Sequence, residues 1–360
     1  MKKLIEWTQA HLIVAFLGLT LAMMYIFLFP IVFLMDSVKQ DLLQLLILYA
    51  CRLCVYGPVL IGMLVTRWTC PERSPAPAWK RWLCFGIVWL VALVIYVLDF
   101  HRNVAEGSLG WVGLTIISIP IAILPAYVVS SAFGRITSLR EYLSTLVHPR
   151  GHWGWYLVAL LTFPVLQVLG LAITQLLGSE PRLSEVHVSP EILWASLLTF
   201  AIVFFYSGGI NEEGGWRGFA QRRLQDRYSP LTANLLLWVY LVLWHIPNDI
   251  LQYRHGGYLL VRFGLFPFIT ILFGWVYNRT KGSILAPALF HASMNSMNTL
   301  QEALPGTNAF FVLLILFAIF AILSDRMWQK LPADHPAVYP VGNAADAVQA
   351  PEQRLKWFQA

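Results

Sequence analysis

The sequence predicts an all-α membrane protein, a polytopic bundle of about ten transmembrane helices. Of its 360 residues, 58% are hydrophobic and only 12% are charged. The mean hydropathy is +0.63. A soluble globular domain typically carries about 25% charged residues, so this composition excludes that class. Apolar runs long enough to cross about 30 Å of hydrocarbon recur along the chain, which favours a helix bundle.

Ten such runs follow one another, separated by polar or charged connections. The first is about 24 residues long and no cleavage site with small residues follows it, so we expect it to remain as a span. The runs lie near residues 11–34, 42–66, 82–100, 110–134, 153–178, 192–211, 231–247, 262–278, 283–300 and 308–324.

The content of these runs divides the chain into three parts. Residues 1–150 form an N-terminal four-span region without recognised motifs, whereas residues 151–326 hold six spans and all the candidate site residues. Residues 327–360 contain Pro332, Pro336 and Pro340 and a run of small residues. We expect this last part to be a mobile cytoplasmic tail, with a short interfacial helix at its end.

The distribution of basic residues predicts the orientation in the membrane. With ten crossings and a cytoplasmic N-terminus, nineteen of the 25 Lys and Arg residues fall on the inner side, five on the outer side, and Arg52 within a span. This bias predicts a multi-pass protein with both termini cytoplasmic. We interpret the net charge of +6 as topology and attraction to membrane lipid, and no motif indicates nucleic acid.

The most informative segment runs from Asn211 to Phe219 and carries two adjacent carboxylates and an arginine. Ionisable side chains at membrane depth cost several kcal/mol, so they persist where they are paired or functional. Glu213 and Arg217 are four residues apart and can form an ion pair on one helix face. Glu212 is rotated by about 100° and can point into a cavity.

Two later spans supply partners for these groups. If the helix of Glu212 continues to a turn at 228–230, His245 on the returning helix lies at the same height, about 24 Å from the turn. His291 and Asn295 are four residues apart on a third helix, at roughly 12 and 18 Å depth. The sequence therefore predicts that groups from three helices converge on one pocket. A carboxylate and an imidazole there can activate water, and an imidazole with an amide can stabilise an oxyanion.

These motifs resemble those of the CPBP family of intramembrane proteases, also called the Abi or CAAX-protease-like family. The segments that carry the resemblance are Glu212-Glu213-x-x-x-Arg217, Leu241-x-x-x-His245 and His291-x-x-x-Asn295, within residues 195–300. Leu241 stands where the family usually has Phe. The resemblance implies a metal-independent endopeptidase that needs no cofactor, with a CPBP-type catalytic core.

The resemblance also implies a role for each residue and a range of substrates. Glu212 and His245 would activate water, His291 and Asn295 would form the oxyanion site, and Glu213 and Arg217 would support them. The substrate would be a peptide or a membrane protein. Family members cleave prenylated C-terminal motifs in eukaryotes, whereas bacterial relatives act on leader peptides or serve in bacteriocin self-immunity.

Other interpretations stay open from the sequence. A single membrane histidine is usually a hydrogen bonder between helices, and Glu, His and His could also bind zinc. The chain could be a non-catalytic immunity or scaffolding protein, or a proton-coupled transporter that uses Glu212 as its carrier. We interpret Arg52 as part of a structural ion pair and Asn248 and Asp249 as residues that end a helix.

Overall fold

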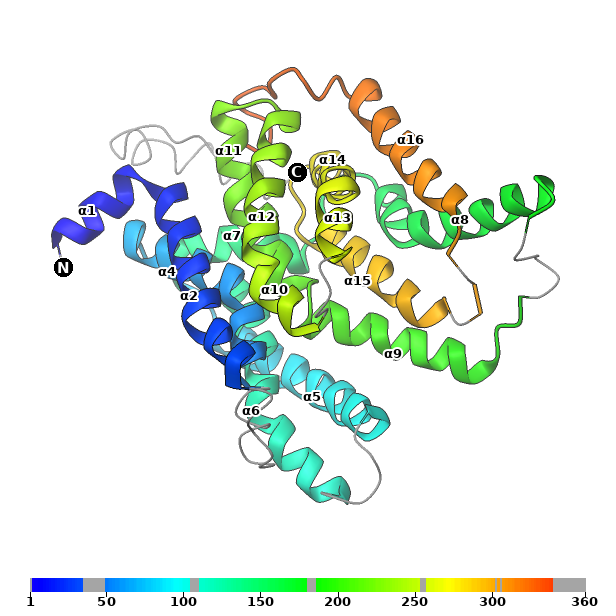
Figure 1. Cartoon of the computed structure of the whole chain (residues 1–360). Coiled ribbons are helices and arrows are strands. Elements are labelled where there is room, and N and C mark those ends of the chain that lie inside the picture. Colours follow the sequence, from blue (N-terminus) through cyan, green and yellow to red (C-terminus); the bar gives the residue numbers. More distant parts are fainter. Residues whose placement is uncertain are drawn as a thin grey trace.

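The computed structural model describes residues 2–34, 49–103, 110–179, 186–252, 257–301, 303–304 and 306–338. Within these ranges the regular structure is helical (Figure 1), apart from one isolated antiparallel bridge between Arg73 and Ile136. The predicted all-α fold is therefore confirmed.

The N-terminal part consists of helices that pack around a bent segment. These are α1 (Lys2–Ala10), α2 (Leu12–Leu34), α4 (Gly57–Thr69), α5 (Ala78–Asn103), α6 (Gly110–Ser130) and α7 (Thr137–Val147). A short helix, Tyr49–Val55, precedes α4 and is bent by 57° from it. Helices α5 and α6 pack along each other and extend away from the other helices (Figure 1).

The C-terminal part contains the motif helices and those that surround them. Its elements are α8 (Gly154–Leu176), α9 (Pro190–Tyr206), α10 (Ile210–Glu213), the π-helix η3 (Gly214–Gln221), α11 (Arg222–Arg227), α12 (Pro230–Gln252), α13 (Gly257–Gly264), α14 (Phe266–Arg279), α15 (Leu285–Leu300) and α16 (Asn308–Ser324). Helix α9 begins at Pro190, and the side chain of the preceding Ser189 caps it by accepting a hydrogen bond from the Ile192 N–H. This is the usual start of a helix.

The described residues contain six helices that are long and apolar enough to cross a membrane, or seven if Tyr49–Val55 and α4 form one bent span. The chain is thus a multi-pass membrane protein, and the expected count of ten is not confirmed. Three expected spans correspond to α14, α15 and α16, which have 14, 16 and 17 residues. A perpendicular crossing needs about 20 residues, so these helices are short for independent spans.

The helix expected to run from about 196 to 226 is present with an interruption. Residues 190–227 form one 38-residue candidate span, but α9 ends at Tyr206 and α10 begins at Ile210. Gly208 has φ 134°, a conformation that side chains rarely adopt. The Gly209 N–H donates to the carbonyl of Val203, six residues earlier. The break lies four residues before Glu212.

Two apolar clusters flank the motif segment. Trp216, Phe219 and Trp244 belong to the cluster that includes the N-terminal helices. Phe273 and Phe290 belong to a second cluster, formed by α8, α14, α15 and α16. The candidate site thus lies between two hydrophobic cores and combines helices from both.

The beginning of the predicted mobile tail is packed rather than free. Met327, Ala337 and Val338 are buried, and the Gln225 side-chain amide donates to the Ala337 carbonyl at 2.9 Å. Residues 327–338 therefore lie against the protein. Residues 339–360, including the expected interfacial helix, lie outside the described residues.

Arg52 does not form the expected ion pair with any described residue. Its Nε donates to the Tyr96 hydroxyl at 3.1 Å, and its guanidinium carbon lies 5.5 Å from the centre of the Tyr96 ring. An aromatic ring and a hydroxyl therefore take the place of a carboxylate, which avoids a second buried charge.

Candidate active site

The segment Gly214–Gln221 is a π-helix pressed against the N-terminal helices. At Gly215 an added Cβ would lie 2.4 Å from the Cβ of Pro58, so only glycine permits this approach. The Tyr142 hydroxyl donates to the Gly214 carbonyl at 2.7 Å. Short π-helical insertions are frequent at functional sites because they displace side chains from the α-helical register.

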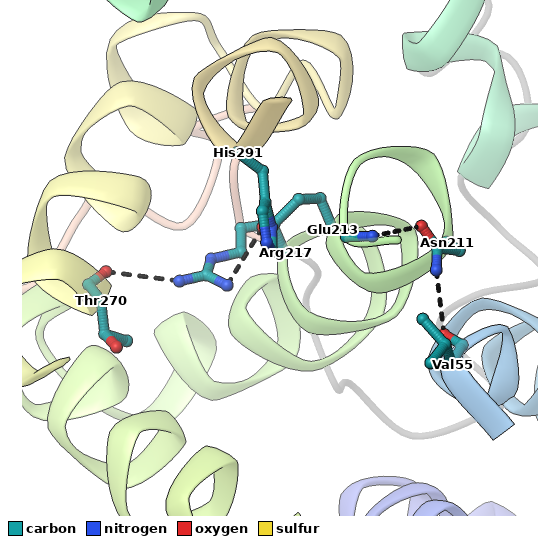
Figure 2. A network of polar contacts seen from close by, with 7 residues as sticks. Val55, Asn211, Glu213, Arg217, Thr270 and His291 are labelled. Carbon is teal, nitrogen blue, oxygen red and sulfur yellow. Dashed lines mark hydrogen bonds and ion pairs between the residues drawn. The ribbon is translucent and has the colours of Figure 1, made fainter. Parts of the chain in front are cut away.

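Glu213 is the centre of the polar network in Figure 2. Its Oε2 forms an ion pair with Arg217 at 3.0 Å, and its Oε1 accepts a hydrogen bond from Nδ1 of His291 at 2.8 Å. Glu213 and Arg217 are 1% and 2% exposed. The expected i, i+4 ion pair is present, and the contact with His291 adds a link that spacing alone does not reveal.

Arg217 is held on its other side by helix α14. Its Nη2 donates to the Thr270 carbonyl at 3.4 Å (Figure 2), and its guanidinium carbon lies 4.7 Å from the centre of the Phe273 ring. The same ring packs edge-on against His291, with 5.3 Å between centroids. Phe273 therefore supports both partners of Glu213.

His291 packs against the break between α9 and α10. A Cβ added at Gly208 would lie 2.3 Å from Nε2 of His291. Because a carboxylate can only accept here, the Nδ1 of His291 carries a hydrogen and its Nε2 faces this turn. The glycine and its positive φ thus provide the space that the imidazole occupies.

Asn211 joins this turn to the bend before α4. Its Oδ1 accepts from the Gly208 N–H at 3.0 Å, and its Nδ2 donates to the Val55 carbonyl at 3.1 Å (Figure 2). The side chain is fully buried. One amide therefore satisfies backbone groups at two helix interruptions, and the N-terminal region contributes to the position of the site.

His245 lies on α12 with its ring orientation fixed. Its Nδ1 is 2.7 Å from the Leu241 carbonyl, and since a carbonyl only accepts, Nδ1 is the donor. The neutral ring then has an unprotonated Nε2 available as a base. Trp244 and Phe266 pack edge-on against this imidazole.

Glu212 is buried, with 7% exposure. It lies within electrostatic range of His291 and Arg262, and His245 lies within range of the same two groups. No hydrogen bond joins Glu212 to His245 among the described residues. The structure therefore brings Glu213, Arg217 and His291 into contact and arranges Glu212 and His245 around shared neighbours.

Asn295 lies one turn after His291 on α15 and is half-buried. Its side chain makes no hydrogen bond with the residues that the structure describes.

A second buried ion pair lies beside the site, between α12 and α13. Arg262 donates through Nε and Nη2 to the two carboxylate oxygens of Asp249, at 2.9 and 2.8 Å, and its guanidinium carbon lies 3.9 Å from the centre of the Phe266 ring. Asp249 does not end a helix, because α12 continues through Pro247 to Gln252. No sequence pattern links Arg262 to Asp249, which is 13 residues earlier on another helix.

No three His, Cys, Asp or Glu side chains within the described ranges are grouped so that they could hold a metal ion.

Comparison with known proteins agrees with the motifs. Residues 194–297 match the family model described as Type II CAAX prenyl endopeptidase Rce1-like. The chain is also 32% identical over 125 residues to CAAX prenyl protease 2 of Methanococcus maripaludis, a match that covers 32% of this chain and 46% of the relative. The chain thus aligns with about half the length of that relative. These matches agree with the resemblance to CAAX-protease-like proteins, and the matched residues 194–297 include all six candidate residues.

Proposed function

We propose that this protein is an intramembrane endopeptidase that hydrolyses a peptide bond with an activated water. The family and the relative support a protease. The observation that carries the mechanism is that both histidines use Nδ1 for a fixed hydrogen bond, to the Leu241 carbonyl in His245 and to Glu213 in His291. In His245 this leaves Nε2 for chemistry, and in His291 it leaves Nε2 at the Gly208 turn.

The two histidines have different partners and therefore different tasks. His245 donates to a neutral carbonyl, so its unprotonated Nε2, together with Glu212, takes the proton of the attacking water. His291 donates from Nδ1 to the carboxylate of Glu213, which holds the ring one helical turn from Asn295. In its imidazolium form His291 also carries a hydrogen on Nε2, and that hydrogen and the amide of Asn295 stabilise the oxyanion of the tetrahedral intermediate. When the intermediate collapses, the C–N bond breaks and the stored proton moves to the leaving amine.

Glu213 and Arg217 act as support in this mechanism. Arg217 pairs with one carboxylate oxygen of Glu213, and the other oxygen accepts the hydrogen bond from His291, so this pair orients the imidazole. The substrate is a peptide or a membrane protein whose scissile bond reaches the site from within the bilayer. We further propose an inner-membrane location with both termini cytoplasmic, which alkaline phosphatase fusions at Met1 and Ala360 would test.

The experiment compares membrane peptides by mass spectrometry from cells that carry the wild type or Glu212→Gln. We expect specific peptides to lose a terminal fragment only with the wild type. If the variant retains the cellular phenotype and no peptide differs, the protein is a non-catalytic scaffold. Substrate flux in proteoliposomes without cleavage would indicate a transporter.

A further inference from the structure

A cavity of about 310 Å³ lies between the end of α4, the start of α5 and the end of α6. None of the candidate catalytic residues lines it. Four arginines line it, Arg67, Arg73, Arg81 and Arg135, and no Asp or Glu is among its lining residues. Arg67 lies in the last turn of α4 and Arg81 in the first turn of α5. The other two lie in the connections that follow α4 and α6.

The four guanidinium groups have no anionic partner among the described residues. None of these four side chains forms an ion pair or a hydrogen bond with a described residue. Like charges around one cavity repel each other, and this repulsion is relieved when an anion binds between them. The positive-inside bias explains why arginines lie on this side of the membrane, but it does not require them to surround a cavity.

The rim of the cavity is a fixed structure. Arg73 and Ile136 form the antiparallel bridge, and the Ser74 N–H donates to the Arg135 carbonyl at 2.9 Å. Arg140 donates to the Ser74 hydroxyl at 2.6 Å. These bonds hold the two connections together, so that Arg73 and Arg135 face one site.

Apolar faces of α5 and α6 continue from this cavity along the helices. Trp82 and Tyr127 line the cavity and are exposed. On α6 the exposed residues recur at helical spacing toward Tyr127, as Val112, Ile116, Ile119 and Ile123. On α5 they continue from Trp82 as Leu83, Ile87, Leu90 and Val94. Each set lies on one helix face, as expected for contact with hydrocarbon chains.

We propose that this cavity binds the headgroup of an anionic glycerophospholipid, whose acyl chains lie along the exposed faces of α5 and α6. A phosphate held by arginines matches the charge, and basic pockets between membrane helices on one side are typical of such sites. The apolar faces that lead into the cavity favour a lipid over a free anion. This site is independent of the proposed proteolysis.

The test measures binding of short-chain phosphatidylglycerol to the full-length protein in neutral detergent by native mass spectrometry. Short-chain phosphatidylcholine and inorganic phosphate are the comparison ligands. We expect phosphatidylglycerol to bind more tightly than either. Each arginine contributes about fivefold, so Arg73→Gln with Arg135→Gln should weaken binding by about 25-fold.

The matched control is Arg227→Gln with Lys330→Gln, which removes two exposed basic residues outside the cavity. Its affinity should equal that of the wild type. Arg81→Gln alone should weaken phosphatidylglycerol binding about fivefold, and this variant replaces the double variant if the latter does not fold. Equal binding of inorganic phosphate or of phosphatidylcholine, or an equal loss in the control, would overturn the proposal.

Discussion

The Nδ1 of His291 lies 2.8 Å from Oε1 of Glu213, although the two residues are 78 positions apart in the chain. The other oxygen of the same carboxylate pairs with Arg217. One buried glutamate thus connects an arginine on its own helix to a histidine on α15. Among the residues that the structure describes, the adjacent Glu212 forms no ion pair, and the proposed division of tasks between the two glutamates rests on this difference.

The first prediction compares the two glutamates. Glu213→Gln should lower the unfolding free energy by about 3–5 kcal/mol, because it leaves Arg217 as an unpaired buried charge. Glu212→Gln should abolish peptide cleavage with little change in thermal stability. Thermal unfolding in detergent and a cleavage assay would measure both quantities. Equal stability losses in the two variants would contradict this assignment.

The second prediction concerns the turn under His291. Gly208→Ala should reduce cleavage by about 100-fold, because the new methyl group would displace the imidazole and a shift of about 1 Å has that effect. The positive φ adds a stability loss of about 1–3 kcal/mol. Gly18→Ala is the control, since a Cβ there meets no atom within 4 Å. Full activity of Gly208→Ala would show that His291 does not depend on this turn.

The third prediction tests the Asp249–Arg262 pair. Arg262→Leu should cost about 3–5 kcal/mol, because Asp249 would remain buried without its partner. The double variant Asp249→Leu with Arg262→Leu should be more stable than Arg262→Leu alone. Chemical unfolding of the four proteins in a double-mutant cycle would give the coupling energy. A coupling near zero would argue against a structural role for this pair.

The fourth prediction addresses metal dependence. Purified protein treated with EDTA or phenanthroline should retain its cleavage activity, because a proton acceptor and oxyanion donors suffice for the proposed mechanism. Rates before and after chelation, with and without added zinc, are the measurement. Activity that is lost and then restored by zinc would instead indicate a metal site at Glu212, His245 and His291.

The fifth prediction concerns pH and the packed segment 331–338. The Ala337 N–H donates to Nδ1 of His335, and burial together with nearby Lys281 lowers the pKa of His335 below its usual value of 6.5. The segment is therefore most stable above pH 6.5 and should loosen as the pH falls through the lowered pKa.

Hydrogen exchange of this segment between pH 7.5 and 5 would measure that loosening. In His335→Asn the amide oxygen can accept the same hydrogen bond without titrating. The pH dependence of the protection against exchange, taken relative to the intrinsic exchange rate, should then disappear. If this protection in the wild type does not change with pH, His335 does not control this segment.

The sequence predicted those parts of the site that depend on local spacing. Glu213 and Arg217 share a helix face, so their ion pair follows from the i, i+4 rule. The links from Glu213 to His291, from Asn211 to Val55 and from Asp249 to Arg262 join separate helices. The first two links involve the break at Gly208 and the bend before α4, and neither interruption has a periodic signal in the sequence.

The placement of Arg217 within the same helix as Glu213 has a consequence for membrane insertion. The chain emerges from the ribosome N-terminus first, so the glutamate enters the membrane before α15 and His291 have been synthesised. An ion pair four residues apart needs no later segment, and it can neutralise the carboxylate while the helix is being inserted. Arg217, which pairs with Glu213 in the folded protein, can thus also pair with it during membrane insertion.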